Sequence, residues 1–244
     1  MANELTDKVA IIVGASRGLG AAIAGAFADA GARLLLVART RENLERIARQ
    51  LAGRGAGVET LAADVTDAEG AAGTVSAAVD CFGRVDVLVN CAGTFLWRSF
   101  ADISATDWRE TIETNLTAPF LLTQAMAASL MEQGHGGAVI NIASIHGEIA
   151  DGNVVPQCAA KLGLVGLTRA SAEALRPHGV RVNAISPGAI EPDSAGRLSD
   201  GLQGKITQGD VAQAAVYLAS DQARGITGAN LEAFGVTRPV VASK

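Results

Sequence analysis

The stretch Val-Ala-Ile-Ile-Val-Gly-Ala-Ser-Arg-Gly-Leu-Gly, residues 9–20, decides the fold. Its first five residues are an apolar run of strand length, and glycines at positions 14, 18 and 20 lead into an alanine-rich segment, 18–30, that predicts a helix. Glycines let the backbone turn tightly against a pyrophosphate, and a helix N-terminus offers unpaired N–H groups. In this context we predict a dinucleotide-binding loop rather than a plain tight turn. The loop residues expected to bind the cofactor are Gly14, Ser16, Arg17, Gly18, Leu19 and Gly20.

Strand-sized apolar segments alternate with helical segments along the rest of the chain. The further strands are predicted at 33–38, 58–63, 85–89, 138–143, 180–186 and 230–234, and the further helices at 41–52, 67–82, 106–133, 154–176 and 211–220. Pro119 is expected to kink the helix at 106–133, and Asp210 to cap the last helix. This alternation is typical of a doubly wound parallel sheet with helices on both faces. We therefore predict a single α/β domain, 1–244, that binds its ligand at the carboxyl ends of the strands.

Composition excludes several classes of protein. With 49% hydrophobic residues among 244, the chain can bury a full core, and its net charge of −5 with scattered basic residues argues against nucleic-acid binding. The longest apolar runs are too short for a membrane helix, and residues 1–7 do not resemble a signal peptide. The three cysteines, which form no Cys-x-x-Cys pair, favour reduced thiols in a cytoplasmic protein, and no metal site is predicted.

The end of the second predicted strand bears on the choice of cofactor. It reads Val37-Ala38-Arg39-Thr40-Arg41 and lacks the acidic residue that a ribose 2′-hydroxyl prefers. Arg39, together with Arg17 in the glycine loop, favours a 2′-phosphate and hence NADP(H). The alternative is that Arg39 and Arg41 only begin a solvated helix. Asp64-Val65, after the third strand, is a candidate acceptor for the adenine amino group, or else a helix cap.

Several motifs occur in an order that resembles the classical short-chain dehydrogenase/reductase family. They are the Gly-x-x-x-Gly-x-Gly loop, Asp64-Val65, Asn90-Cys91-Ala92-Gly93, Asn115, Ser144, Lys161 and Pro187-Gly188. The resemblance covers nearly the whole chain and implies a Rossmann-type fold. It also implies an oxidoreductase in which Asn115, Ser144 and Lys161 are catalytic. The further cofactor contacts that it implies are Asn90, Ala92, Gly93, Lys161, Pro187 and Gly188.

The family's proton donor is missing from its expected place. The resemblance puts a tyrosine four residues before Lys161 and thirteen after Ser144, and both counts fall on Gln157. A glutamine amide donates hydrogen bonds but does not ionise near neutral pH, and general acid–base help is worth about 10²–10⁴ in rate. His146 is a candidate replacement acid, because imidazole titrates near pH ~6.5. Its alternative is a loop histidine that faces solvent.

Two further departures concern the substrate and the assembly. Pro192 stands where the family usually has a threonine, and the substrate segment at about 189–209 is shorter than usual, which suggests an open site or one completed by another subunit. Residues 233–236 depart from the family's usual C-terminal turn. The helices at 106–133 and 154–176 usually form the family's dimer face, so we expect a homodimer or homotetramer.

Two functions follow as hypotheses. The first is an NADPH-dependent reductase that acts on a C=O or an iminium C=N group of a small molecule. An iminium ion needs no proton donor, whereas a ketone would depend on Ser144 with water, or on His146. The second is a non-redox protein on the same scaffold, either a cyclase, isomerase or lyase or a cofactor-sensing protein, that keeps NADP(H) binding.

Overall fold

The computed structural model of the protein describes residues 4–190 and 206–235. These residues form a parallel sheet of seven strands in the order β3-β2-β1-β4-β5-β6-β7. The doubly wound parallel sheet predicted from the sequence is confirmed. The strand order reverses between β1 and β4, which is where open α/β sheets bind their ligands. The strands are β1 Val9–Val13, β2 Arg33–Ala38, β3 Val58–Ala62, β4 Val87–Asn90, β5 Gly137–Ile142, β6 Val180–Pro187 and β7 Asn230–Ala233.

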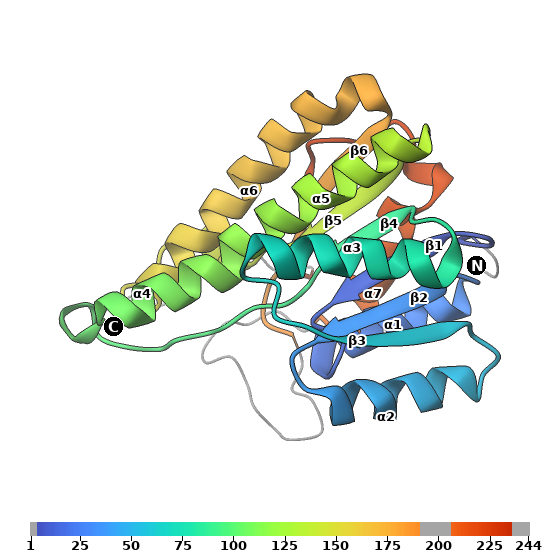
Figure 1. Cartoon of the computed structure of the whole chain (residues 1–244). Helices are drawn as coiled ribbons and strands as arrows, with labels where there is room; N and C mark the ends of the chain where they lie inside the picture. The colour runs from blue at the N-terminus through green and yellow to red at the C-terminus, as the bar shows by residue number, and fades with distance from the viewer. Residues whose placement is uncertain (1–3, 191–205, 236–244) are drawn as a thin grey trace.

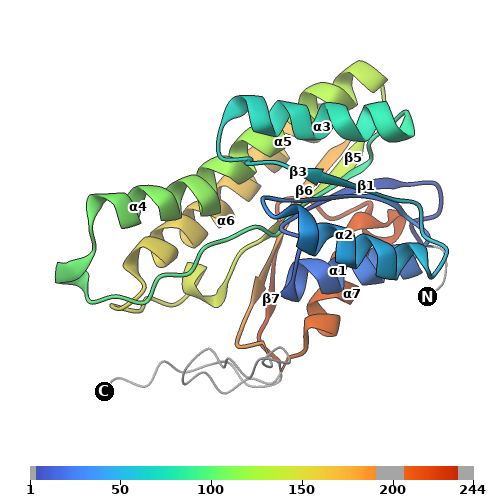
Figure 2. The same ribbon diagram turned by 60° about the horizontal axis from the view of Figure 1, so that its bottom comes forward.

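Helices cover both faces of the sheet (Figures 1 and 2). One face carries α1 (Gly18–Asp29), α2 (Arg41–Ala52) and α7 (Gln208–Ala219). The other carries α3 (Ala68–Phe82), α5 (Ala118–Gln133) and α6 (Val155–Leu175). Because side chains alternate along a strand, Ile12 packs toward the first face and Ile11 toward the second. Each fully buried aliphatic side chain of this kind stabilises the fold by about 1.5–3 kcal/mol.

The helix predicted at 106–133 is interrupted by a π-helical turn just before Pro119. Helix α4 (Ala105–Ile112) passes into a π-helical turn, η2 (Glu113–Thr117), and α5 begins directly after it with Pro119 in its first turn. Proline has no N–H, so the carbonyl of Asn115 loses its usual i+4 donor in any case. The wider turn is therefore placed just before the proline, and it carries Asn115, whose side chain is fully buried. Such π turns are frequent at functional sites.

Two predicted helix starts are corrected. Asp67 is the N-cap of α3 and not its first residue, because its side chain accepts a hydrogen bond from the Gly70 N–H at 2.8 Å. Thr207, not Asp210, caps α7, and Asp210 completes a capping box by accepting from the Thr207 N–H at 2.7 Å. Strand β4 is also shifted, since it begins at Val87 and continues to Asn90. The other predicted boundaries agree within one residue or so.

Most of the expected substrate segment lies outside the described residues, so the predictions made for it have no structural counterpart. Of residues 189–209, the stretch 191–205 lies outside the described residues, and Pro192 lies within that stretch. Ile190 and Ile206, at its two ends, form an isolated parallel bridge. Among residues 4–190 and 206–235, no helix is long and apolar enough to cross a membrane.

Candidate active site

A cavity of about 460 Å³ lies at the switch point, where β1, β2 and β4 end. Its walls come from the glycine loop, the end of β2, the segment after β3 and the segment after β4. The predicted cofactor residues that line it are Gly14, Ser16, Arg17, Gly18, Leu19, Gly20, Arg39, Asp64, Val65, Ala92 and Gly93. Asn43 and Thr114 also line the cavity. No local sequence pattern indicates this, because their helical segments meet the cavity only in the fold.

The glycine loop has the shape that a phosphate group requires. Gly14 and Gly18 have φ angles of 87° and 55°, and a Cβ atom on Gly14 would lie 2.6 Å from the backbone nitrogen of Ala92. A Cβ atom on Gly20 would collide with the carbonyl of Gly14. The N-cap of α1, Arg17, makes no capping hydrogen bond, and the first turn holds no acidic residue. The first N–H groups of α1 are therefore left for a ligand, and the loop fits a dinucleotide phosphate.

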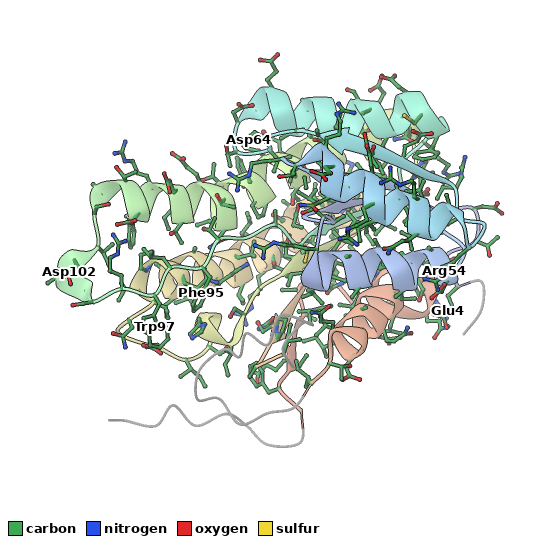
Figure 3. All side chains as sticks on the ribbon, turned by 90° about the horizontal axis from the view of Figure 1, so that it is seen from below. Glu4, Arg54, Asp64, Phe95, Trp97 and Asp102 are labelled. Atoms are coloured by element: carbon green, nitrogen blue, oxygen red, sulfur yellow. The ribbon has the colours of Figure 1, made fainter. Side chains whose placement is uncertain are left out.

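Arg17 and Arg39 both face this cavity, and neither forms an ion pair with any described residue. Asp64, labelled in Figure 3, lines the same cavity. The pKa of its carboxyl is lowered chiefly by hydrogen bonds from the Thr66 hydroxyl and N–H, at 2.8 and 3.0 Å, and to a smaller extent by the charge of Arg39. Arg41 does not line the cavity.

Four residues predicted to contact the cofactor do not line this cavity, namely Asn90, Lys161, Pro187 and Gly188. Asn90 is buried, and its Nδ2 donates to Oδ1 of Asn141 at 2.8 Å, which ties β4 to β5 inside the sheet. Its own Oδ1 is buried with no hydrogen-bond partner among the described residues. Pro187 and Gly188 lie at the end of β6, where the Gly188 N–H donates to the carbonyl of Ala233 at 2.9 Å.

A second group of polar side chains adjoins the cavity through the segment after β4. Asn115 in the π turn is oriented by the backbone of Thr94: its Oδ1 accepts from the Thr94 N–H, and its Nδ2 donates to the Thr94 carbonyl, both at 2.9 Å. The second hydrogen of Nδ2 is donated to Oε1 of Gln157 at 2.6 Å. This bond fixes the orientation of the Gln157 amide. Its nitrogen, Nε2, makes no hydrogen bond to any described residue, although the side chain is only 7% exposed.

Lys161 lies one helical turn after Gln157 on the same face of α6. Its Nζ donates to the carbonyl of Ile142 at 2.7 Å, and burial lowers the pKa of its ammonium group to about 8. Burial also raises the pKa of the neighbouring Cys91 thiol to about 12, so this thiol remains neutral. Gly93 fits between these groups, because a Cβ atom there would lie 3.1 Å from Oδ1 of Asn115 and 4.0 Å from Nζ of Lys161.

Ser144 and His146 lie together just after β5. Ser144 caps the short turn η3 (Ile145–Gly147), where its Oγ accepts from the His146 N–H at 3.2 Å and lies 3.4 Å from Nδ1 of the ring. The ring is half-buried and packs against Phe95, with a centroid distance of 6.0 Å, so His146 is not the solvent-facing histidine that the sequence left open. Burial lowers the pKa of His146, and Asp151 opposes that shift.

Phe95 is followed by a second aromatic residue, Trp97, with a centroid distance of 6.5 Å (Figure 3). Both side chains are largely exposed. No local sequence pattern indicates this aromatic pair, because its relation to His146 arises only from the fold. Through its contact with His146, Phe95 places this exposed aromatic pair beside the residue that adjoins Ser144.

Known proteins resemble this chain over nearly its whole length. Residues 8–203 match the family described as short chain dehydrogenase. A D-threitol dehydrogenase of Mycolicibacterium smegmatis is 38% identical over 239 residues, covering 93% of this chain and 92% of that protein. A 3-oxoacyl-acyl-carrier-protein reductase of Escherichia coli is 34% identical over 238 residues, covering 93% and 96%. The crystal structure of a short-chain dehydrogenase/reductase from Burkholderia xenovorans superposes with a TM-score of 0.89 at 31% identity, covering 96% and 97%.

Proposed function

Because the chain belongs to the short chain dehydrogenase family, we propose that it is an NADP(H)-dependent oxidoreductase that reduces the carbonyl group of a small molecule. The observation that carries this proposal is the Gln157 amide, whose N–H groups have no described partner beside an otherwise ordered Asn115–Lys161 cluster. The names of the two relatives, a dehydrogenase and a 3-oxoacyl reductase, support chemistry between alcohols and carbonyls.

In this proposal the cofactor is held by two groups of residues. The glycine loop binds the pyrophosphate, and Arg17 and Arg39 bind the 2′-phosphate. Ala92, Gly93 and Lys161 hold the nicotinamide half, with Pro187-Gly188 at its far side. When bound in reduced form, the nicotinamide ring supplies the hydride.

Replacing Arg39 by aspartate is expected to weaken NADPH binding about 10- to 100-fold, because hydrogen bonds to a charged group are worth about 1.5–3 kcal/mol. Arg41→Asp is the matched control, since Arg41 lies two residues later, at the start of α2, but does not line the cavity. It should change the dissociation constant by less than about 3-fold. Fluorescence titration of each variant with NADPH measures both effects, and equal losses in the two variants would contradict the assignment of Arg39.

We assign to Gln157 the position of the family's catalytic tyrosine, with a different role. Because Oε1 of Gln157 accepts a hydrogen bond from Asn115, the amide has its N–H donors left for a substrate. Such donors suit a substrate oxygen that gains negative charge. The Ser144 hydroxyl is the second donor to that oxygen. Neither the amide nor the buried ammonium group of Lys161 favours a cation, so the geometry supports a carbonyl substrate over an iminium ion.

The proton then comes through Ser144. Its hydroxyl donates the proton to the substrate oxygen, and the Nδ1–H of a protonated His146 restores it. The 3.4 Å separation is longer than a good hydrogen bond, but catalytic hydrogen bonds often shorten when substrate binds. The Ser144–His146 relay thus moves one proton from the imidazole to the product alcohol. Lys161 and Asn115 hold the neighbouring groups in place.

This relay predicts how the kcat/KM for ketone reduction depends on pH. Burial lowers the pKa of His146 below 6.5, so the acid form is lost as the pH rises through that lowered value. The kcat/KM for ketone reduction should therefore fall as the pH rises from about 5.5 to about 8. His146→Gln should remove this slope and slow the reaction mainly at the acid end. An unchanged pH profile in the variant would rule out His146 as the acid.

A panel of ketones, enones and cyclic iminium ions tests the proposed activity, with NADPH consumption followed by absorbance. We expect turnover with ketones first. Turnover with the iminium class alone would show that the site works without a proton donor. The second candidate function, a non-redox protein, is favoured by the inability of the Gln157 amide to ionise. It requires product without any change in the redox state of the cofactor, and NADP⁺ formed in step with product would exclude it.

We also propose that the protein is cytoplasmic and forms a homodimer or homotetramer through α4–α5 and α6. Phe120 and Met131 on α5 and Leu162 on α6 support this assembly, because they are exposed by 44%, 44% and 62%. Large apolar side chains that gather on neighbouring helices favour an interface.

A further inference from the structure

A second cavity, of about 480 Å³, lies at the opposite edge of the sheet from the candidate active site. Its walls include the residues at the starts of β4, β5 and β6 and the turn that follows α7. We call it the basal cavity, and its charged lining residues are Lys8, Asp86, Arg176, Arg181, Asp221 and Arg224. Because it lies at the amino ends of the strands, it is separate from the proposed cofactor site.

The charges around the basal cavity do not cancel. Asp86 is already neutralised by Arg84, whose guanidinium donates to its two oxygens at 3.0 and 2.5 Å. Arg176 pairs with Glu173 at 2.9 Å, and Lys8 lies 3.7 Å from Asp221. No ion pair with a described residue is left for Arg181 or Arg224. In a chain whose net charge is −5, this cavity therefore has an excess of positive charge.

The surroundings of Arg181 disfavour the positive charge of its guanidinium. Its guanidinium donates to the carbonyls of Leu218, Ala219 and Ser220 at 2.6, 3.2 and 3.2 Å, so its described acceptors are all neutral. Burial lowers its pKa, and the charge of Asp221 opposes that shift. The carbonyl end of α7 offsets about half a charge. A partly buried cation without a full counter-charge favours the binding of an anion.

The backbone leaves room for such an anion. Gly136, Gly137 and Gly179 line the cavity without side chains, and a Cβ atom on Gly136 would collide with the carbonyl of Gly179. Gly225, next to Arg224, has no atom within 4 Å of the position of an added Cβ. The space near Arg224 is therefore open.

We propose that the basal cavity binds a phosphate dianion, free or carried as a phosphomonoester, between Arg224 and Arg181. Arg181 supplies a charge that the fold already fixes in position, and Arg224 supplies an exposed guanidinium with no described partner. The volume of about 480 Å³ exceeds what inorganic phosphate alone needs, so a small phosphorylated molecule also fits.

Calorimetric titration of the full chain at constant ionic strength tests this proposal, with inorganic phosphate and glycerol 3-phosphate as probes and chloride as the reference. We expect binding of phosphate over chloride, and Arg224→Gln should weaken it about 5-fold. The Arg224 guanidinium makes no hydrogen bond with a described residue, and the bond from the Arg224 N–H to the carbonyl of Asp221 does not depend on the side chain, so this variant should keep its unfolding temperature. Arg181→Gln should weaken binding as well, but it also removes contacts to the end of α7.

A matched control separates this cavity from the cofactor site, which also attracts phosphate. Arg39→Gln should leave unchanged the component of phosphate binding that Arg224→Gln weakens, because Arg39 lines only the other cavity. Tighter binding of glycerol 3-phosphate than of phosphate would identify a phosphomonoester as the ligand, and equal binding would identify free phosphate. The absence of binding over chloride, or an affinity that Arg39→Gln lowers and Arg224→Gln does not, would overturn the proposal.

Discussion

Replacing Gln157 by tyrosine is expected to raise the rate of ketone reduction by about 10²-fold or more, because it supplies an ionisable hydroxyl where the amide now lies. Lys161, one turn later on α6, is placed to lower the pKa of that hydroxyl, and the buried side chain at position 157 already faces Asn115. The kcat/KM for a ketone with saturating NADPH measures the effect.

Gln157→Phe is the matched control for this experiment. Phenylalanine has nearly the same size as tyrosine but carries no hydroxyl, and it removes the amide donors of the parent chain. Its rate should fall below that of the parent. A similar gain in both variants would mean that the ring itself, and not proton transfer, causes the increase.

Replacing Lys161 by methionine is expected to lower kcat/KM about 10- to 100-fold while leaving the fold at least as stable at neutral pH. The loss of activity follows from the proposed contact with the nicotinamide half. The variant should keep its stability because burial makes the charge of Lys161 unfavourable in the folded state. The lowering of its pKa from 10.5 to about 8 reflects this effect. Removing that charge is worth at most about 3 kcal/mol, less the hydrogen bond to the Ile142 carbonyl.

The pH dependence of unfolding separates this explanation from a general packing effect. Between about 8 and 10.5 the unfolded state binds a proton that the folded state has lost, so the parent protein gains stability from this group as the pH rises. Lys161→Met should lack that gain, and Lys161→Arg, which stays charged, should lack it too. Denaturant unfolding at several pH values measures the difference. A parallel pH dependence in parent and Lys161→Met would show that Lys161 does not titrate in this window.

The features of the fold that depend on a local sequence pattern could be predicted from the sequence. The run at 9–13 and the glycines at 14, 18 and 20 predicted a strand, a turn and a helix, and all three are present. Asn115, Ser144, Gln157 and Lys161 were selected by spacing and resemblance, and the fold brings each of them near the carboxyl ends of β4 and β5.

Other features depend on contacts between distant residues and could not be predicted. The direction of the Gln157 amide is decided by the Thr94 backbone acting through Asn115, which no local pattern encodes. Asn90 points into the sheet because Asn141 on the next strand offers an acceptor there. The basal cavity is formed by charges from separate segments of the chain, such as Lys8, Arg181 and Arg224, so it appears only once the strands are aligned.

The proposed function requires that the glycine loop and the arginines beside it bind a 2′-phosphorylated nicotinamide cofactor. Titration of the purified chain with NADPH and with NADH tests it directly, using the fluorescence of the reduced ring. We expect NADPH to bind at least about 10-fold more tightly than NADH, because Arg17 and Arg39 line the cavity without ion-pair partners among the described residues. No affinity for either nucleotide, or tighter binding of NADH, would contradict the account.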